Sequence, residues 1–119
     1  RLLEQAIEQF CNDTPTLAHG DFDATHIFHV DHQYTGIIDF GEIRGTNRLY
    51  DLGHFAIENA HFLPALLEGY QEISPLPVDY EAQIQQGALL AAAKRAGRRL
   101  ARAAKALDID WHVMERALV

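Results

Sequence analysis

The first ten residues alternate apolar and polar side chains at helical spacing. The apolar members fall on one side of a helix over residues 1–10, and they are Leu2, Leu3, Ala6, Ile7 and Phe10. Asn12 to Pro15 then interrupt the pattern with residues that commonly end helices. The pattern therefore predicts an amphipathic helix followed by a loop.

A longer periodic segment lies in the last third of the chain. Its apolar residues follow steps of four and three, and they are Leu89, Ala93, Ala96, Leu100, Ala103 and Leu107. At about 100° per residue these positions share one narrow helical face, which we expect to pack into the core. The basic residues of the segment lie opposite, and they are Lys94, Arg95, Arg98, Arg99, Arg102 and Lys105. This basic stripe is typical of a solvated face; the alternatives are contact with the acidic part of the chain, with a partner or with a phosphate-bearing substrate.

Between these helices, two short apolar segments predict a β-hairpin. Residues 27–30 and 34–38 are rich in β-branched and aromatic side chains, and a short polar turn separates them. Asn47 is placed to cap a helix over residues 48–59, and Pro64 suits the first turn of another helix. The order of these elements predicts an α+β fold that is mainly α.

Length and composition restrict the class of protein. The chain has 119 residues, 48% of them hydrophobic, which suits one domain with one core. The formal net charge of −7 argues against nucleic-acid binding. The acidic residues before position 94 favour a cationic ligand or a metal ion, with ordinary solubility as the alternative reason for the charge. The single cysteine excludes an intrachain disulfide and fits a reducing compartment. No apolar stretch is long enough to cross a membrane and no secretory signal is visible, so we expect a cytoplasmic protein.

Two loop carboxylates carry the strongest chemical signal. Asp21 precedes the predicted hairpin and Asp39 follows it. Because a hairpin returns the chain beside its start, both side chains are expected to face one site. One carboxylate then accepts a proton from a hydroxyl while the other holds a divalent cation. Phosphoryl transfer requires this pairing, because charge must be neutralised and the nucleophile aligned.

Three motifs around these carboxylates occur in a characteristic order. They are His19-Gly20-Asp21, Asp39-Phe40-Gly41 and Leu49-Tyr50-Asp51-Leu52. The protein-kinase patterns are H-R-D and D-F-G, and small-molecule kinases commonly have H-G-D in place of H-R-D. In this order the motifs resemble the carboxyl-terminal lobe of the aminoglycoside phosphotransferase and choline kinase-like enzymes, which share the protein-kinase fold.

The resemblance implies a role for each matching residue. Asp21 would be the catalytic base, which receives the proton of the acceptor hydroxyl, and Asp39 would be the main magnesium ligand. His19 would support the loop by packing and hydrogen bonding, and Asp51 would accept hydrogen bonds from the loop backbone. The resemblance also implies ATP as the phosphoryl donor, Mg²⁺ or Mn²⁺ as the cofactor, and the hydroxyl group of a small molecule as the acceptor.

His26 departs from the family pattern, which has an asparagine five residues after the catalytic aspartate. Mg²⁺ prefers oxygen ligands, whereas an imidazole nitrogen suits transition metals. His26 is therefore a candidate metal ligand that favours Mn²⁺ or Zn²⁺, or a candidate phosphate contact, with a local hydrogen-bonding role as the alternative.

The phosphate-clamping part of a kinase is not recognisable in this sequence. No G-x-G-x-x-G loop is present, and Lys94 and Lys105, the only lysines, both lie in the late helix. We therefore expect residues 1–119 to form the carboxyl-terminal lobe alone and a missing amino-terminal lobe of the same protein to complete it. We expect this fragment by itself to be inactive.

Two further acidic residues could take part in a site. Asp23 lies two residues past the candidate base and Glu42 directly follows D-F-G, so both are candidate substrate contacts. His54 and His61 fall in predicted helices, where packing or surface roles are the usual ones.

Two other classes of function stay open at this stage. The histidine at position 26 favours a non-catalytic pseudo-kinase or interaction domain. A histidine-rich metal-binding module is favoured by the crowding of His19, Asp21, Asp23, His26, His29 and His32, although their spacing lacks the closed pattern of a structural zinc site.

Overall fold

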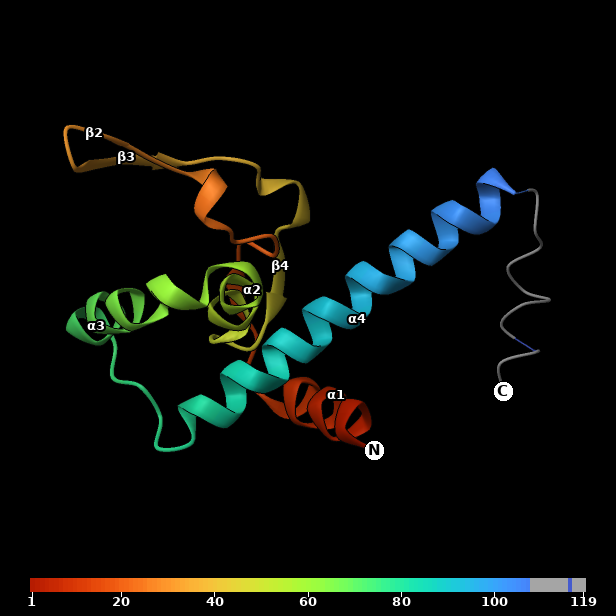
Figure 1. Ribbon diagram of the computed structural model, residues 1–119. Coiled ribbons are helices and arrows are strands. Elements are labelled where there is room, and N and C mark those ends of the chain that lie inside the picture. Colours follow the sequence, from red (N-terminus) through yellow and green to blue (C-terminus); the bar gives the residue numbers. More distant parts are fainter. Residues whose placement is uncertain (108–115, 117–119) are drawn as a thin grey trace.

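The computed structural model describes residues 1–107 and residue 116, and this part of the chain is mainly helical. The helices are α1 (Leu2–Asn12), α2 (Tyr50–Asn59), α3 (Leu63–Ile73) and α4 (Tyr80–Ala106). Short 3₁₀ turns are η1 (Ala24–His26), η2 (Phe40–Glu42) and η3 (Ala60–Phe62). The long α4 crosses α2 and α1, as Figure 1 shows. The predicted amino-terminal helix is confirmed, and Pro64 lies in the first turn of α3 as expected.

The strands form two small antiparallel pairs, which agrees with the predicted α+β class. The hairpin pairs β2 (Ile27–Val30) with β3 (Gln33–Ile37) and projects away from the helices in Figure 1. Its turn is shorter than predicted, because Asp31 and His32 both adopt left-handed φ angles of 49° and 61°. Two such residues connect antiparallel strands with the twist that strands prefer.

The second strand pair was not predicted from the sequence. β1 (Thr16–Ala18) pairs with β4 (Arg44–Thr46), and Ala18 lies opposite Arg44. The pair joins the segment before Asp21 to the segment after Asp39. The chain on both sides of the hairpin is therefore tied together at its base, close to the two carboxylates.

The core lies where α1, α2 and α4 meet. One buried cluster joins Phe10, Ala18, Tyr50 and Ala91, and a second joins Leu49, Leu52 and Ile84. Gly53 and Gly87 allow a close crossing of α2 and α4, because a Cβ atom on Gly53 would lie 2.5 Å from the backbone nitrogen of Ala88. This crossing fixes the position of α2, whose first turn reaches the candidate site.

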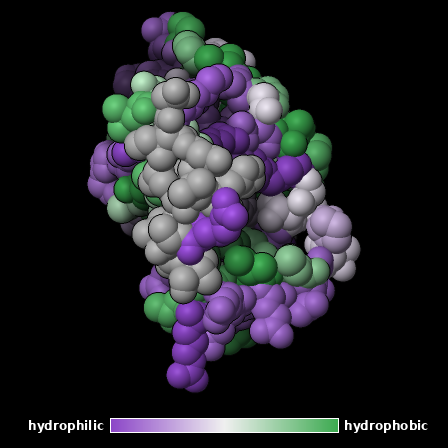
Figure 2. Space-filling model, turned by 90° about the vertical axis from the view of Figure 1, so that its right-hand side faces the viewer, coloured by the Kyte–Doolittle hydropathy of each residue, from purple (hydrophilic) through white to green (hydrophobic). Residues whose placement is uncertain are grey.

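The predicted buried face of α4 is wrong. Leu89, Leu100 and Leu107 are 38%, 42% and 70% exposed, whereas the buried positions at the crossing are Ile84, Gly87 and Ala91. Alanine occurs on several sides of this helix, so the spacing of leucine and alanine did not single out the buried face. The glycine contact with α2 instead selects the face that is buried. Figure 2 accordingly shows hydrophobic and hydrophilic residues interspersed over one side of the molecule.

The predicted cap at Asn47 also differs from the structure. Its side-chain oxygen accepts the backbone N–H of Leu49 at 2.7 Å, and α2 begins only at Tyr50. Asn47 is buried, and its amide nitrogen donates to Asp13 and Gln83. It therefore closes the turn ahead of α2 and ties that turn to α4.

In the part of the chain that the structure describes, no helix has the length and apolar character of a membrane span.

Candidate active site

The first turn of α2 holds the backbone of the H-G-D loop, residues 19–21. Asp51 accepts the backbone N–H of His19 at 2.8 Å through Oδ2 and that of Gly20 at 2.9 Å through Oδ1. Charge-assisted bonds of this kind are stronger than neutral ones. Asp51 therefore sets the direction in which the loop presents Asp21.

His19 ties the same loop to the segment that carries Asp39. Its Nδ1 accepts the backbone N–H of Asp21 at 3.3 Å, so its proton lies on Nε2, which donates to the carbonyl oxygen of Ile38 at 2.8 Å. The ring is buried and packs against Phe40 with a centroid distance of 4.7 Å. These contacts are those of a supporting residue rather than of a nucleophile.

Gly20 makes the close approach of the two loops possible. Its φ of +85° is one that residues with a side chain rarely adopt, and a Cβ atom there would lie 2.0 Å from the carbonyl oxygen of Glu42. The H-G-D loop therefore lies directly against η2, the turn that follows Asp39.

The close approach of the two loops brings together three side chains, those of Asp21, His26 and Asp39. Each offers one ligand atom, and these atoms all lie within 4.8 Å of one another. Nδ1 of His26 contacts the carbonyl oxygen of Asp21 at 2.9 Å and must donate to it, which leaves the lone pair of Nε2 3.6 Å from Oδ2 of Asp39. A carbonyl partner of this kind fixes the ring in the tautomer that a metal ligand needs. Asp39 and His26 thus offer a carboxylate oxygen and an imidazole nitrogen to a divalent cation, with the Asp21 carboxylate beside them.

His54 belongs to the site, although the sequence pattern placed it among packing or surface residues. It is buried, its Nδ1 lies 2.9 Å from the carbonyl oxygen of Phe22, and its Nε2 lies 3.1 Å from Oδ1 of Asp21. Both ring nitrogens therefore face oxygen atoms; because Nδ1 donates to the carbonyl, Nε2 pairs with the Asp21 carboxylate only when the ring carries both protons. The sequence did contain a signal for this position. Residues three apart lie on one helix face, and His54 follows Asp51 by three, so a helix that turns Asp51 toward the H-G-D loop places His54 on the same side.

Asp23 lies outside this convergence and anchors the backbone. Its Oδ1 accepts the N–H of Thr25 at 2.9 Å and its hydroxyl at 2.8 Å, and its Oδ2 accepts the amide of Asn59 at 3.0 Å. Burial opposes ionisation of this carboxyl, but the bonds from Thr25 and Asn59 outweigh it and lower the pKa of Asp23. The residue caps η1, which positions His26.

Glu42 is surrounded by basic side chains. Its Oε2 lies 2.8 Å from Nη2 of Arg44, 2.6 Å from Nζ of Lys94 and 2.6 Å from Nη2 of Arg98. The hydrogen bond from Arg98, reinforced by the charges of Arg98 and Arg44, lowers the pKa of Glu42. Part of the basic stripe of α4 therefore contacts the acidic part of the chain, and Arg95 does the same at Glu58.

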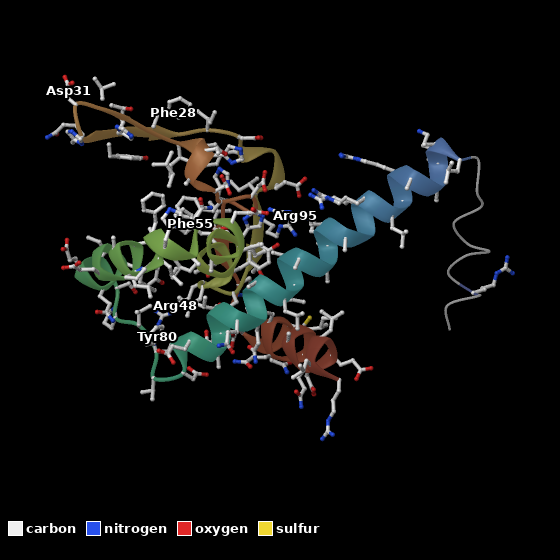
Figure 3. The ribbon with its side chains drawn as sticks, in the orientation of Figure 1. Phe28, Asp31, Arg48, Phe55, Tyr80 and Arg95 are labelled. Atoms are coloured by element: carbon white, nitrogen blue, oxygen red, sulfur yellow. The ribbon has the colours of Figure 1, made fainter. Side chains whose placement is uncertain are left out.

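The remaining histidines of the hairpin do not join the metal-ligand group. His29 and His32 are exposed, and the one group of possible ligands found in the described residues contains His26 as its single histidine. Figure 3 shows Asp31 at the hairpin tip, whereas His26 and Asp39 lie in the chain next to the opposite end of the two strands. This geometry does not favour a histidine-rich centre.

Comparison with known proteins adds one finding. The model of the Phosphotransferase enzyme family matches residues 1–82 of this chain. Those residues include the H-G-D loop, the three converging side chains, Asp51 and His54. No curated protein and no solved structure shows significant similarity to the chain.

Proposed function

Since the chain belongs to the Phosphotransferase enzyme family, we propose that it is the catalytic lobe of an enzyme that transfers the γ-phosphoryl group of ATP to the hydroxyl group of a small molecule. Membership of the family confirms the resemblance that the motifs predicted. The observation that carries the proposal is the convergence of Asp21, His26 and Asp39 within 4.8 Å. In this proposal, residues 1–119 correspond to the carboxyl-terminal lobe of a protein-kinase-like fold.

Asp21 is the proposed base. As the acceptor oxygen attacks the γ-phosphorus, Asp21 takes the hydroxyl proton, the bond between the γ-phosphorus and its bridging oxygen breaks, and ADP leaves with the electron pair. His54 lies against Oδ1 of Asp21, and Asp51 holds the backbone of the same loop. The carboxylate therefore meets the hydroxyl in a fixed orientation, which lowers the entropic cost of reaching the transition state.

Asp39 and His26 are the proposed metal ligands. The carboxylate of Asp39 is more than half exposed, and the free lone pair of Nε2 on His26 points toward it. A divalent cation held by this pair would neutralise the charge of the phosphate groups. Because one ligand atom is nitrogen, we expect the site to prefer Mn²⁺ over Mg²⁺.

Exposed apolar residues around the site support the existence of an amino-terminal lobe outside this chain. Phe28 on β2, and Ile38, Phe40 and Ile43 beside Asp39, are each about half exposed. Side chains of this size usually lie beneath another part of the protein when they gather in one region. The lobe that clamps the nucleotide is the proposed cover.

The non-catalytic interpretation is less well supported. It depends on His26 in the place of the asparagine of the family, yet the hydrogen bond to the Asp21 carbonyl leaves His26 able to bind a metal. The geometry thus preserves the capacity to bind a metal, which a pseudo-kinase would have lost.

Binding of Mn²⁺ to the 119-residue chain tests the proposal without an acceptor. Electron paramagnetic resonance should detect one Mn²⁺ site, and Asp39→Asn should weaken binding by about tenfold or more, since even the hydrogen-bonding partners of metal ligands have effects of that size. His26→Asn replaces the nitrogen ligand by oxygen and should move the preference toward Mg²⁺.

Asp31→Asn is the matched control, because Asp31 is an exposed aspartate at the hairpin tip (Figure 3). It should bind Mn²⁺ as the unchanged chain does. Equal Mn²⁺ affinity in the Asp39→Asn and Asp31→Asn variants would contradict the proposed metal site.

A further inference from the structure

We propose that Lys94 and Arg98 form an oxyanion subsite beside Asp21, which binds a phosphate or carboxylate group of the acceptor. This inference rests on the proposed function, since it describes the acceptor of that reaction. It differs from the expectation that net charge alone suggested, because local charge rather than the total charge acts on a bound group.

The charges around Glu42 do not balance. Three cationic side chains contact one carboxylate oxygen at 2.6–2.8 Å, which leaves the cluster with a charge of 3 − 1 = +2. Lys94 and Arg98 each use one donor on Glu42 in these contacts, although an ammonium has three N–H donors and a guanidinium has five. The cluster therefore has both the charge and the donors to bind an anion.

A small cavity places this cluster next to the reacting group. The cavity has a volume of about 60 Å³ and is lined by Asp21, His54, Glu42, Lys94 and Arg98, among others. A single water molecule needs roughly 10–15 Å³ measured in this way, so a tetrahedral oxyanion has room. The backbone of Gly20, with no side chain, forms part of the wall.

The position of the cavity favours the acceptor rather than the nucleotide as the source of the anion. Asp21 is the one residue that belongs both to the converging trio and to the cavity lining; His26 and Asp39 do not line the cavity. The proposed metal ligands therefore lie outside the cavity that the basic side chains line, and Asp21 borders both. In-line transfer requires the nucleotide and the acceptor on opposite sides of the reacting atoms.

Binding of inorganic phosphate to the metal-free 119-residue chain tests the subsite. Titration followed by amide chemical shifts should show saturable binding that weakens with salt. Arg98→Ala and Lys94→Ala should each weaken binding by about tenfold, since each removes a charge-assisted hydrogen bond. Glu42→Gln removes the competing carboxylate charge and should tighten binding. Arg102→Ala, an exposed position four residues further along α4, is the matched control and should leave binding unchanged.

Two results of this titration would overturn the subsite. The first is absence of phosphate binding in both the unchanged chain and the Glu42→Gln variant, which would leave Glu42 as a purely structural anchor for α4. The second is an equal loss in Arg98→Ala and Arg102→Ala, which would indicate non-specific attraction to the basic helix. Circular dichroism of each variant confirms that α4 is retained, so a folding defect is recognised as such.

The source of the anion is tested in the complete enzyme, meaning this chain with its proposed amino-terminal lobe. Phosphate binding that persists when a non-hydrolysable ATP analogue with Mn²⁺ saturates the enzyme supports an acceptor subsite. Competition between the two overturns it and assigns the cluster to the nucleotide. Mn²⁺ binding is measured in the same samples, so that the two proposals can fail separately. Samples that bind Mn²⁺ but not phosphate would refute the subsite alone. Samples that bind phosphate but not Mn²⁺ would refute the proposed function alone.

Discussion

Replacing Asp21 by asparagine is expected to lower kcat of the complete enzyme by about 10²–10⁴-fold, the contribution typical of a general base. The amide keeps an oxygen that the ring of His54 contacts, at 3.1 Å in the unchanged chain, but it cannot accept the hydroxyl proton. The affinity for the metal–nucleotide complex should be nearly unchanged, because Asp39 and His26 are the proposed ligands. Steady-state transfer of labelled phosphate and nucleotide titration measure the two quantities separately.

Asp39→Asn provides the contrast in that experiment, since it should weaken metal–nucleotide binding itself. Asp31→Asn should change neither quantity, because the hairpin tip lies away from the site (Figure 3). Near-normal turnover in both Asp21→Asn and Asp39→Asn would refute the assignment of base and metal ligand.

Gly53→Ala is expected to destabilise the fold by about 1–3 kcal/mol, as overpacked cores commonly are. A Cβ atom at this position would lie 2.5 Å from the nitrogen of Ala88 and 2.6 Å from the carbonyl oxygen of Ile84, so α2 and α4 would have to separate. Because α2 carries Asp51 and His54, the same change should also loosen the H-G-D loop. Urea denaturation followed by circular dichroism gives the free energy of unfolding.

Gly97→Ala is the matched control on α4. Apart from the neighbouring backbone of α4 itself, no atom of the described residues lies within 4 Å of the place that a Cβ atom would take at Gly97. Alanine should therefore stabilise the helix by up to about 1 kcal/mol. If both substitutions changed the free energy of unfolding by the same amount, the close crossing of α2 and α4 would not be what holds the fold.

Local sequence signals predicted the elements that carry the site, because those elements depend on neighbouring residues. The hairpin follows from β-branched segments on either side of a polar turn, and the H-G-D and D-F-G motifs identified Asp21 and Asp39 as candidates. The buried face of α4 could not be obtained in this way. It depends on Gly53 and Gly87, which lie 34 residues apart and whose contact leaves no periodic pattern.

The polar contacts that the sequence did not predict are those between distant residues. Glu42 contacts Lys94 and Arg98, which are 52 and 56 positions away, and charge alone did not identify which acid each base contacts. His54 reaches Asp21 because α2 returns beneath the H-G-D loop. Contacts between distant residues therefore bring Lys94 and Arg98 to the cavity beside Asp21, whereas the short motifs identified Asp21 itself.

The most direct test of the proposed catalytic centre is the location of a bound metal in crystals of the chain soaked with Mn²⁺. Anomalous scattering should give one peak within about 2.0–2.6 Å of a carboxylate oxygen of Asp39 and of Nε2 of His26, on the side that faces Asp21. A peak at any other group of ligands, with Asp39 and His26 unligated, would contradict the assignment of these two residues as the metal site.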